Sequence, residues 1–164
     1  MQRTQTALRA AALTMVLAMA LASPAPAKTE TIKGTSGWTG KLDMIATTKK
    51  DMGWAYSLNY TWLAENNNPE LSLSGRCIGS GGMVDGKYES APFFCTINAA
   101  DGSSYMGRGI GSPKGAKSIL FGGTGAFKGV SGMVIGGPAV KLPAPKGSFA
   151  RCREDVVVRT LPDK

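Results

Sequence analysis

The sequence predicts an all-β domain, an antiparallel barrel of about eight strands, on three observations. After residue 27, no stretch shows the spacing of three to four residues that an amphipathic helix needs. Apolar and polar residues alternate instead, as they do in strands with one buried face. Turn signals and 22 glycines separate the alternating stretches at short intervals, which is typical of a strongly curved sheet. A sandwich of two sheets is the alternative.

The first 27 residues have the features of a secretory signal peptide. Arg3 and Arg9 give a positive start, and an apolar run from residue 10 to residue 22 follows. This run is too short to span a bilayer, so a membrane anchor is the less favoured interpretation. Ala25 and Ala27 are small residues of the kind that a signal peptidase recognises, and we therefore expect cleavage after Ala27.

The remaining residues, 28–164, are expected to form a single barrel domain in the periplasm or outside the cell. The whole chain has a net charge of +8. Its basic residues are scattered and not clustered with aromatics, which argues against nucleic-acid binding. Histidine is absent, so Ser-His-Asp triads and the commonest metal ligand are excluded. We expect no metal, no cofactor and no segment that spans a membrane.

The clearest strand runs from residue 52 to residue 62, after an expected strand near residues 38–48. Its even positions are all large and apolar. The aromatic members of this stripe could line a pocket for an apolar ligand. Packing in a core, or against another subunit, is the more usual role of such a stripe. The predicted ligand-binding residues are Trp54, Tyr56, Tyr60 and Trp62.

Six further strands follow by the same alternation, with Asp85-Gly86 and Asp101-Gly102 as hairpin signals. Pro138, Pro143 and Pro145 indicate a stiff loop before the last strand. The expected strands cover residues 71–79, 93–98, 105–110, 118–121, 127–135 and 149–160.

Cys77 and Cys95 flank the Asp85-Gly86 turn symmetrically. If residues 85–87 form a three-residue loop, the two cysteines fall opposite each other, on the apolar faces of their strands. An oxidising compartment permits the bond, so we predict a Cys77–Cys95 disulfide. The alternatives are a different pairing that includes Cys152, or three free thiols. In the favoured arrangement Cys152 is a buried spare.

The stretch from Phe121 to Gly132 reads FGGTGAFKGVSG. Gly122, Gly123 and Gly125 allow positive φ angles in a tight turn, and Phe127 could then plug one end of the barrel. No helix is expected to follow, so the stretch does not predict a phosphate-binding loop.

This stretch resembles the G-G-T-G-x-F-x-G-x-x-G hairpin shared by plant allene oxide cyclases and dirigent proteins. The region from Cys77 to Gly109 looks like that of exported bacterial proteins with an allene-oxide-cyclase-like barrel. The resemblance implies an eight-stranded antiparallel barrel and, as in the plant members, assembly into a homo-oligomer. The catalytic residues of the plant enzymes lie outside the matched motif and do not carry over to this sequence.

Glu154 is the single, weak candidate for acid–base chemistry. It shares its parity with apolar residues of the last strand, on the face expected to line the barrel. A carboxylate inside a barrel can act as an acid or base, but it more often pairs with an arginine such as Arg76 or Arg108. Arg151 and Arg153 fall on the opposite face by parity. We therefore expect that Glu154 is not catalytic.

These observations favour an exported barrel that binds a small apolar molecule or a partner without catalysis. A cyclase or isomerase that shapes a reactive substrate in the barrel is the first alternative, and a structural envelope protein is the second. The interior distinguishes them. An open apolar cavity favours the binder, a polar cavity with an isolated carboxylate favours the enzyme, and a filled lumen favours the structural role.

Overall fold

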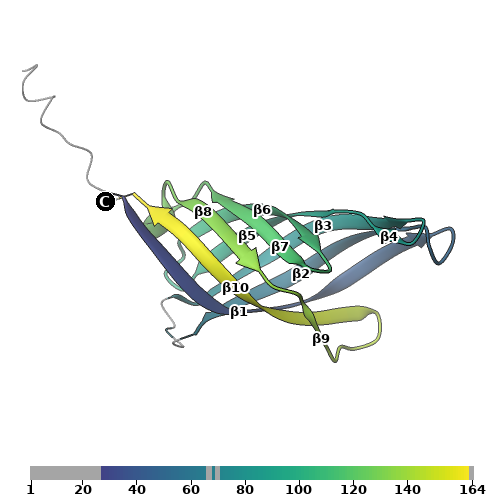
Figure 1. Ribbon diagram of the computed structural model, residues 1–164. Helices are drawn as coiled ribbons and strands as arrows, with labels where there is room; N and C mark the ends of the chain where they lie inside the picture. The colour runs from purple at the N-terminus through teal and green to yellow at the C-terminus, as the bar shows by residue number, and fades with distance from the viewer. Residues whose placement is uncertain (1–26, 66–67, 69–70, 163–164) are drawn as a thin grey trace, which may run out of the picture.

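The first and last strands of the domain pair with each other, and this pairing closes the sheet into a barrel. The computed structural model describes residues 27–65, 68 and 71–162. The predicted signal segment therefore lies outside the described residues, apart from Ala27. Within the described residues, ten strands form one antiparallel sheet (Figure 1). The strands are β1 (Lys28–Ala46), β2 (Met52–Ala64), β3 (Leu73–Val84), β4 (Lys87–Tyr88), β5 (Ala91–Ala99), β6 (Ser104–Ser112), β7 (Gly115–Phe121), β8 (Ser131–Gly136), β9 (Val140–Leu142) and β10 (Ser148–Leu161).

Eight of these strands close the barrel in the order β1-β2-β3-β5-β6-β7-β8-β10, with β10 returning to β1. The short strands β4 and β9 pair with the end of β3 and the start of β10, respectively. The all-β prediction and the eight-stranded antiparallel barrel are thus confirmed, and the sandwich alternative is wrong. In the part of the chain described here, no helix is long and apolar enough to cross a membrane.

β1 begins ten residues earlier than the sequence predicted, at Lys28 rather than near Trp38. The early part of this strand is polar, so its alternation carries little hydrophobic signal. It forms because β10 pairs with it continuously, from Lys28 opposite Leu161 to Lys41 opposite Ser148. The ladder therefore extends through residues whose own side chains do not identify a strand.

Four connections turn at the same end of the barrel, those from β1 to β2, from β3 to β5, from β6 to β7 and from β8 to β10 (Figure 1). We call this the open end; it comprises residues 41–52, 81–91, 111–116 and 137–151. The opposite end, where both ends of the described chain lie, is the closed end.

The glycine-rich stretch closes that end, as predicted, although its local structure differs from the prediction. Gly122, Gly123 and Gly125 have φ angles of 69°, 123° and 55°. They lead into a 3-10 turn, η2 (Gly125–Phe127), and β8 starts only at Ser131. The predicted strand over 127–135 was therefore four residues too long at its start.

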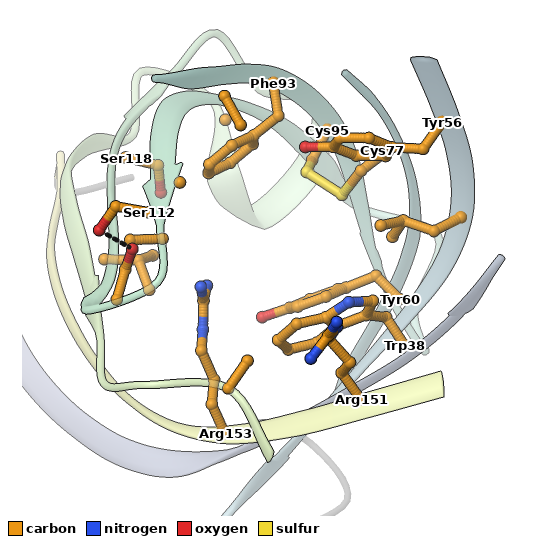
Figure 2. A pocket seen from close by; sticks show the side chains of 18 of the residues that line it. Trp38, Tyr56, Tyr60, Cys77, Phe93, Cys95, Ser112, Ser118, Arg151 and Arg153 are labelled. Carbon is orange, nitrogen blue, oxygen red and sulfur yellow. Dashed lines mark hydrogen bonds between the residues drawn. A yellow bond between two sulfur atoms is a disulfide. The ribbon is translucent and has the colours of Figure 1, made fainter. Parts of the chain in front are cut away.

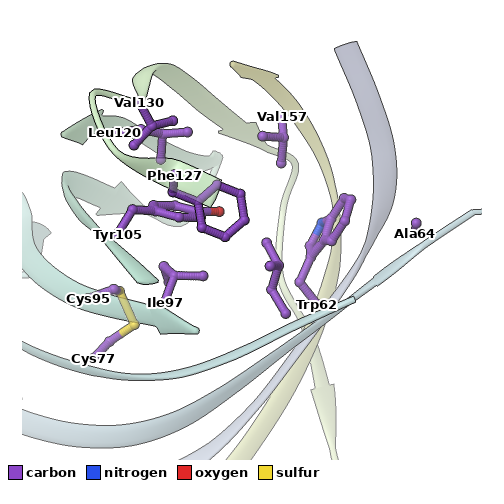
Figure 3. Close-up of a cluster of buried hydrophobic side chains, with 11 residues drawn as sticks. Trp62, Ala64, Cys77, Cys95, Ile97, Tyr105, Leu120, Phe127, Val130 and Val157 are labelled. Carbon is purple, nitrogen blue, oxygen red and sulfur yellow. A yellow bond between two sulfur atoms is a disulfide. The ribbon is translucent and has the colours of Figure 1, made fainter. Parts of the chain in front are cut away.

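Phe127 is buried at the closed end, and its ring meets the Tyr105 ring edge-on with centroids 4.8 Å apart (Figure 3). The guanidinium of Arg159 lies 5.1 Å from the centroid of the Phe127 ring, and its Nε donates a hydrogen bond to the Glu30 carboxylate. Other buried apolar side chains complete this end. They include Trp62, Leu120, Val130 and Val157. The Arg159–Glu30 ion pair and this cluster of apolar side chains together close the barrel at this end.

The Cys77–Cys95 disulfide is confirmed, although the predicted turn was wrong. The hairpin has a two-residue Asp85-Gly86 turn, because Val84 pairs with Lys87. One extra residue between β4 and β5 then shifts the register, so that Cys77 still faces Cys95. The ladder is interrupted between the Met83–Tyr88 and Gly79–Phe93 pairs, where three residues of β3 face four on the other strand, as in a β-bulge.

Candidate functional site

The barrel contains a cavity of about 670 Å³ that extends from the open end toward the closed end. This volume lies within the range of roughly 300–1,000 Å³ that is usual for small-molecule sites. Figure 2 shows side chains from several strands pointing into it. The residues that line it near the open end, such as Met44 and Tyr88, are exposed to solvent. The cavity is therefore accessible from that end of the barrel.

Glycines on the inner face of β6 leave part of this space. Gly107 and Gly111 both line the cavity. A Cβ atom built on Gly107 would find its nearest neighbour, the Ile119 carbonyl oxygen, 3.8 Å away. Neither position is filled by a neighbouring side chain, so the lumen stays open here. The alternating glycines of β6 are the sequence signal for this cavity, which the alternation of apolar residues alone does not reveal.

Aromatic side chains form much of the cavity wall. Trp54, Tyr56 and Tyr60 of β2 line it, as the stripe predicted. The ring of Tyr56 packs edge-on against Phe149 of β10, with centroids 6.5 Å apart. Trp62 does not reach the cavity, because it is 1% exposed and belongs to the cluster at the closed end. Three of the four predicted ligand-binding residues thus face the cavity, and their binding role stays a prediction.

Arg153 of β10 points into the cavity (Figure 2). Its Nε donates a 2.7 Å hydrogen bond to Asp155 Oδ1, and its guanidinium lies 5.1 Å from the centroid of the Trp38 ring. Its two terminal nitrogens donate to none of the described residues. Arg151, one step closer to the open end, also lines the cavity. The site therefore combines apolar walls with two cationic groups on one strand.

The inner face of β10 is the opposite of the one expected. Glu154 is exposed on the outer wall, whereas Arg153 and Asp155 point inward. The expectation that Glu154 could face the barrel interior is therefore wrong. The small apolar residues that share its parity, such as Val156 and Val158, lie on the outer wall with it. The buried carboxylate of this strand is Asp155, which is 2% exposed.

Asp155 has a glycine on each neighbouring strand, and Gly136 is the one that makes room for its carboxylate. In the ladder, Gly34 of β1 and Gly136 of β8 lie on either side of it. A Cβ atom on Gly136 would approach Asp155 Oδ1 to 2.3 Å and Arg153 Nε to 2.4 Å. Asp155 Oδ2 has no hydrogen-bond partner among the described residues. A buried carboxylate oxygen without a partner is costly and is often found at functional sites.

Burial keeps the tyrosines of the interior protonated. It raises the pKa of Tyr60 well above its usual value, and the negative charge of Asp155 raises it further. Burial also raises the pKa of Tyr56 to about 12, where the charge of Tyr88 adds to the effect. These phenols therefore remain neutral hydrogen-bond donors at physiological pH, facing the same interior as Arg153.

The remaining sequence predictions concern cysteines and metals. The Cys77–Cys95 disulfide forms part of the cavity wall, and Cys152 forms no disulfide. Within the described ranges, no group of three or more histidine, cysteine, aspartate or glutamate side chains could hold a metal ion. The cavity thus presents aromatic rings, phenol hydroxyls and guanidinium groups to whatever enters it.

Comparison with known proteins adds a fold relationship. No family model and no curated protein matches this chain. Among solved structures, it is similar to a pterocarpan synthase dirigent protein, with a TM-score of 0.52 and 14% sequence identity. The match covers 87% of this chain and 90% of that protein. At this identity the likeness concerns the fold alone, and it shows that the chain has a dirigent-like barrel.

Proposed function

We propose that this barrel binds a small, largely apolar molecule in its lumen without chemically changing it. The observation that carries the proposal is the accessible cavity of about 670 Å³ with aromatic walls. A structural envelope protein would be expected to have a filled lumen. Aromatic walls supply a large contact area and lose little conformational freedom when a ligand binds.

The two arginines specify the ligand further. Among the described residues, the terminal nitrogens of Arg153 have no hydrogen-bond partner, and they lie in a lumen with largely apolar walls. Such donors favour a ligand with a carboxylate, phenolate or similar acceptor group. The neutral phenols of Tyr56 and Tyr60 can donate further hydrogen bonds. The ligand class is thus amphipathic, with an apolar body among the aromatic rings and an anionic or acceptor group near β10.

Paired fluorescent probes test this proposal. Anilinonaphthalene sulfonate is an anion, and N-phenylnaphthylamine is a neutral compound of similar shape. We expect both to bind in the lumen, the anion more tightly. Arg151→Gln should weaken binding of the anion by about tenfold, or about 1.4 kcal/mol, and leave the neutral probe unaffected. Arg108→Gln removes the same charge from the outer wall and is the matched control. Equal binding of the anion by both variants would contradict a role for Arg151 in binding the anionic group.

A second function, a cyclase or isomerase, has one observation in its favour. Among the described residues, Asp155 Oδ2 is buried without a hydrogen-bond partner, and the charge of Asp155 raises the pKa of the Tyr60 phenol. A carboxylate in that state could move a proton to or from a reactive substrate. Against this role, its other oxygen is bound to Arg153 and Asp155 does not itself line the cavity. A screen with epoxide and polyene substrates, comparing the wild type with Asp155→Asn, would reveal turnover.

We also propose that the protein is exported and acts in the periplasm or outside the cell. The disulfide supports this location, because such bonds persist in oxidising compartments. N-terminal sequencing of protein recovered from the cell envelope should begin at Lys28. Recovery of a chain that still starts at Met1 would contradict export with cleavage after Ala27.

Assembly into a homo-oligomer remains a proposal of the same kind. The outer wall carries exposed apolar side chains on neighbouring strands, among them Ile78 of β3 and its ladder partner Phe94 of β5, with Ile119 on β7. Exposed apolar side chains in adjacent rows are a common feature of subunit contacts. Light scattering of the purified protein measures the mass directly, and a monomeric mass at all concentrations would refute assembly.

A further inference from the structure

The open end of the barrel is surrounded by exposed lysines. They come from every hairpin at that end, so they encircle the entrance to the cavity. In the part of the chain described here, none of them forms an ion pair. The seven are Lys41, Lys49, Lys50, Lys87, Lys114, Lys141 and Lys146.

Acidic residues at the same end do not balance these lysines. There are four, and one of them is engaged within the protein. Asp51 accepts a hydrogen bond from the Asp85 backbone N–H at 2.9 Å and another from the Thr48 hydroxyl at 2.8 Å. These two hydrogen bonds lower the pKa of Asp51 and keep it ionised. The four acidic residues are Asp43, Asp51, Asp85 and Glu89.

The closed end shows a different charge pattern. Among the described residues there, Glu30 is paired with both Arg159 and Lys28. Lys33, whose carbonyl accepts a hydrogen bond from the Glu65 N–H, and Lys128 stand against Glu65 and Asp101, so four basic residues face three acidic ones at this end. The outer wall between the two ends carries the exposed Arg76, Arg108 and Lys117 against Glu154. The excess positive charge is therefore largest at the open end, where eight basic residues, Arg151 included, face four acidic ones.

Apolar side chains project among the lysines. Ile45, at the tip of β1, is 80% exposed, and Met44 before it is 54% exposed. Val140 of β9, in the connection from β8 to β10, is 60% exposed. Aliphatic side chains and lysines on the same protruding loops are the combination found in segments that insert into a bilayer interface.

The hairpin tips hold these groups in a fixed arrangement. The β1–β2 and β3–β4 tips are joined by the Asp85–Asp51 hydrogen bond and by a 3.0 Å bond from the Gly86 N–H to the Lys50 carbonyl. Lys50 and Lys87 are thus held on adjoining tips before any partner arrives. A preformed surface loses less conformational freedom on binding than two independent loops would.

We propose that the open end docks on an anionic bilayer surface, so that the cavity opens toward the lipid. The lysines would contact anionic headgroups, and Ile45, Met44 and Val140 would enter the boundary between headgroups and acyl chains. A second copy of this end is a poor partner, because lysines would face lysines. An acidic protein could form ion pairs with the lysines, but it would leave the protruding aliphatic side chains in contact with polar groups.

Vesicle sedimentation tests this proposal, with protein that an expression host has exported. Vesicles of phosphatidylcholine alone are compared with vesicles containing about one third phosphatidylglycerol, in low salt and in about 1 M salt. We expect binding to the anionic vesicles only, with loss in high salt. Absence of binding to anionic vesicles in low salt would overturn the proposal.

Two sets of variants assign the binding to the open end. Lys49→Gln, Lys50→Gln and Lys87→Gln together should weaken vesicle binding at least about tenfold. The matched control, with Lys33, Lys117 and Lys128 each changed to Gln, loses the same charge from exposed positions elsewhere and should bind like the wild type. Equal loss in both variants would show attraction by net charge alone and would refute docking through the open end.

Insertion of the tip is tested separately with brominated lipids. A tryptophan introduced by Ile45→Trp should be quenched when the protein binds anionic vesicles made with those lipids. Ala100→Trp, at an exposed position of the closed end, is the control and should not be quenched.

If the protein binds immobilised polyglutamate but not vesicles, the partner is an acidic protein and the lipid assignment is wrong. Binding of anilinonaphthalene sulfonate without vesicles reports on the cavity independently.

Discussion

Gly136 lies beside Asp155 in the β8–β10 ladder, and a Cβ atom at Gly136 would come within 2.3 Å of Asp155 Oδ1. The same atom would approach Arg153 Nε to 2.4 Å. The backbone of Gly136 does not have a positive φ angle, so the need for glycine here is steric. The buried ion pair of the lumen therefore depends on the absence of a side chain on the neighbouring strand.

Gly136→Ala should consequently destabilise the fold by about 1–3 kcal/mol, because one added methyl group must displace the ion pair. When Gly136→Ala is combined with Asp155→Ala, the loss of unfolding free energy should be smaller than the sum of the two single losses. The reason is that the added methyl group no longer collides with the Asp155 carboxylate. Urea unfolding measures these free energies. Gly37→Ala is the control, since a Cβ atom there meets nothing within 4 Å. Strict additivity of the two changes would contradict this account.

The neighbouring carboxylates of β10 should respond differently to neutralisation. Asp155→Asn leaves Arg153 without its buried partner and should lower the free energy of unfolding by about 3 kcal/mol. Glu154→Gln, on the exposed outer wall, should change it by less than about 0.5 kcal/mol. Thermal and urea denaturation of both variants provide the comparison. A larger effect at Glu154 than at Asp155 would mean that the inner face of β10 has been misassigned.

Reduction of the disulfide should destabilise the barrel. The bond joins residues 18 apart in sequence, and closing a loop of this size contributes about 3 kcal/mol. Changing both Cys77 and Cys95 to Ala should have the same effect, and a reducing agent should then have no further effect on the variant. Cys152→Ser is the matched control and should unfold like the wild type in oxidised conditions. Unfolding curves with and without reductant distinguish these outcomes.

The sequence was sufficient to predict the barrel, because alternation is strong where one face packs against aromatic side chains, as in β2. It did not reveal which face of β10 points inward. In a closed barrel the outer wall is itself partly apolar, as the exposed Phe94 and Ile119 show. Alternation alone therefore does not distinguish Val156 on the outer wall from Val157 in the core. Gly136 carries the missing information, because a side chain there would collide with the Asp155 carboxylate, but the two residues become neighbours only after folding.

The disulfide prediction was right because two local differences compensated each other. The predicted three-residue loop contained one residue more than the real Asp85-Gly86 turn, in which Asp85 takes a φ angle of 52° and Gly86 one of 74°. The real hairpin regains that residue in a bulge before β5. The bulge lies between Tyr88 and Phe93, with Gly81 and Gly82 on one strand and Pro92 on the other. Such residues do not show in a single sequence where the extra residue falls, so pairing of the two cysteines was predictable and the path between them was not.

Stability should fall at alkaline pH. Burial raises the pKa of Tyr105 to about 12 in the folded protein, whereas the unfolded value is near 10. The folded state therefore holds this proton more tightly, and the contribution to stability is complete below about pH 10 and is lost as pH rises toward 12. For one such tyrosine the expected slope approaches about 1.4 kcal/mol per pH unit. Urea midpoints measured across this range should decline less steeply for Tyr105→Phe, and a slope equal to that of the wild type would refute the assignment.

Filling the lumen should abolish ligand binding while the barrel remains folded. Gly107 is buried on the inner face of β6, lies opposite Cys95, and lines the cavity; a Cβ atom there would meet no atom closer than 3.8 Å. Gly107→Phe should therefore place a ring in the cavity without a severe clash. We expect the affinity for N-phenylnaphthylamine to fall at least about tenfold, equivalent to about 1.4 kcal/mol. Gly37→Phe adds the same ring on the outer wall and should bind like the wild type, with circular dichroism confirming that both variants are folded. If a folded Gly107→Phe protein still binds the probe with wild-type affinity, the probe does not occupy the lumen, and the proposed ligand site is elsewhere.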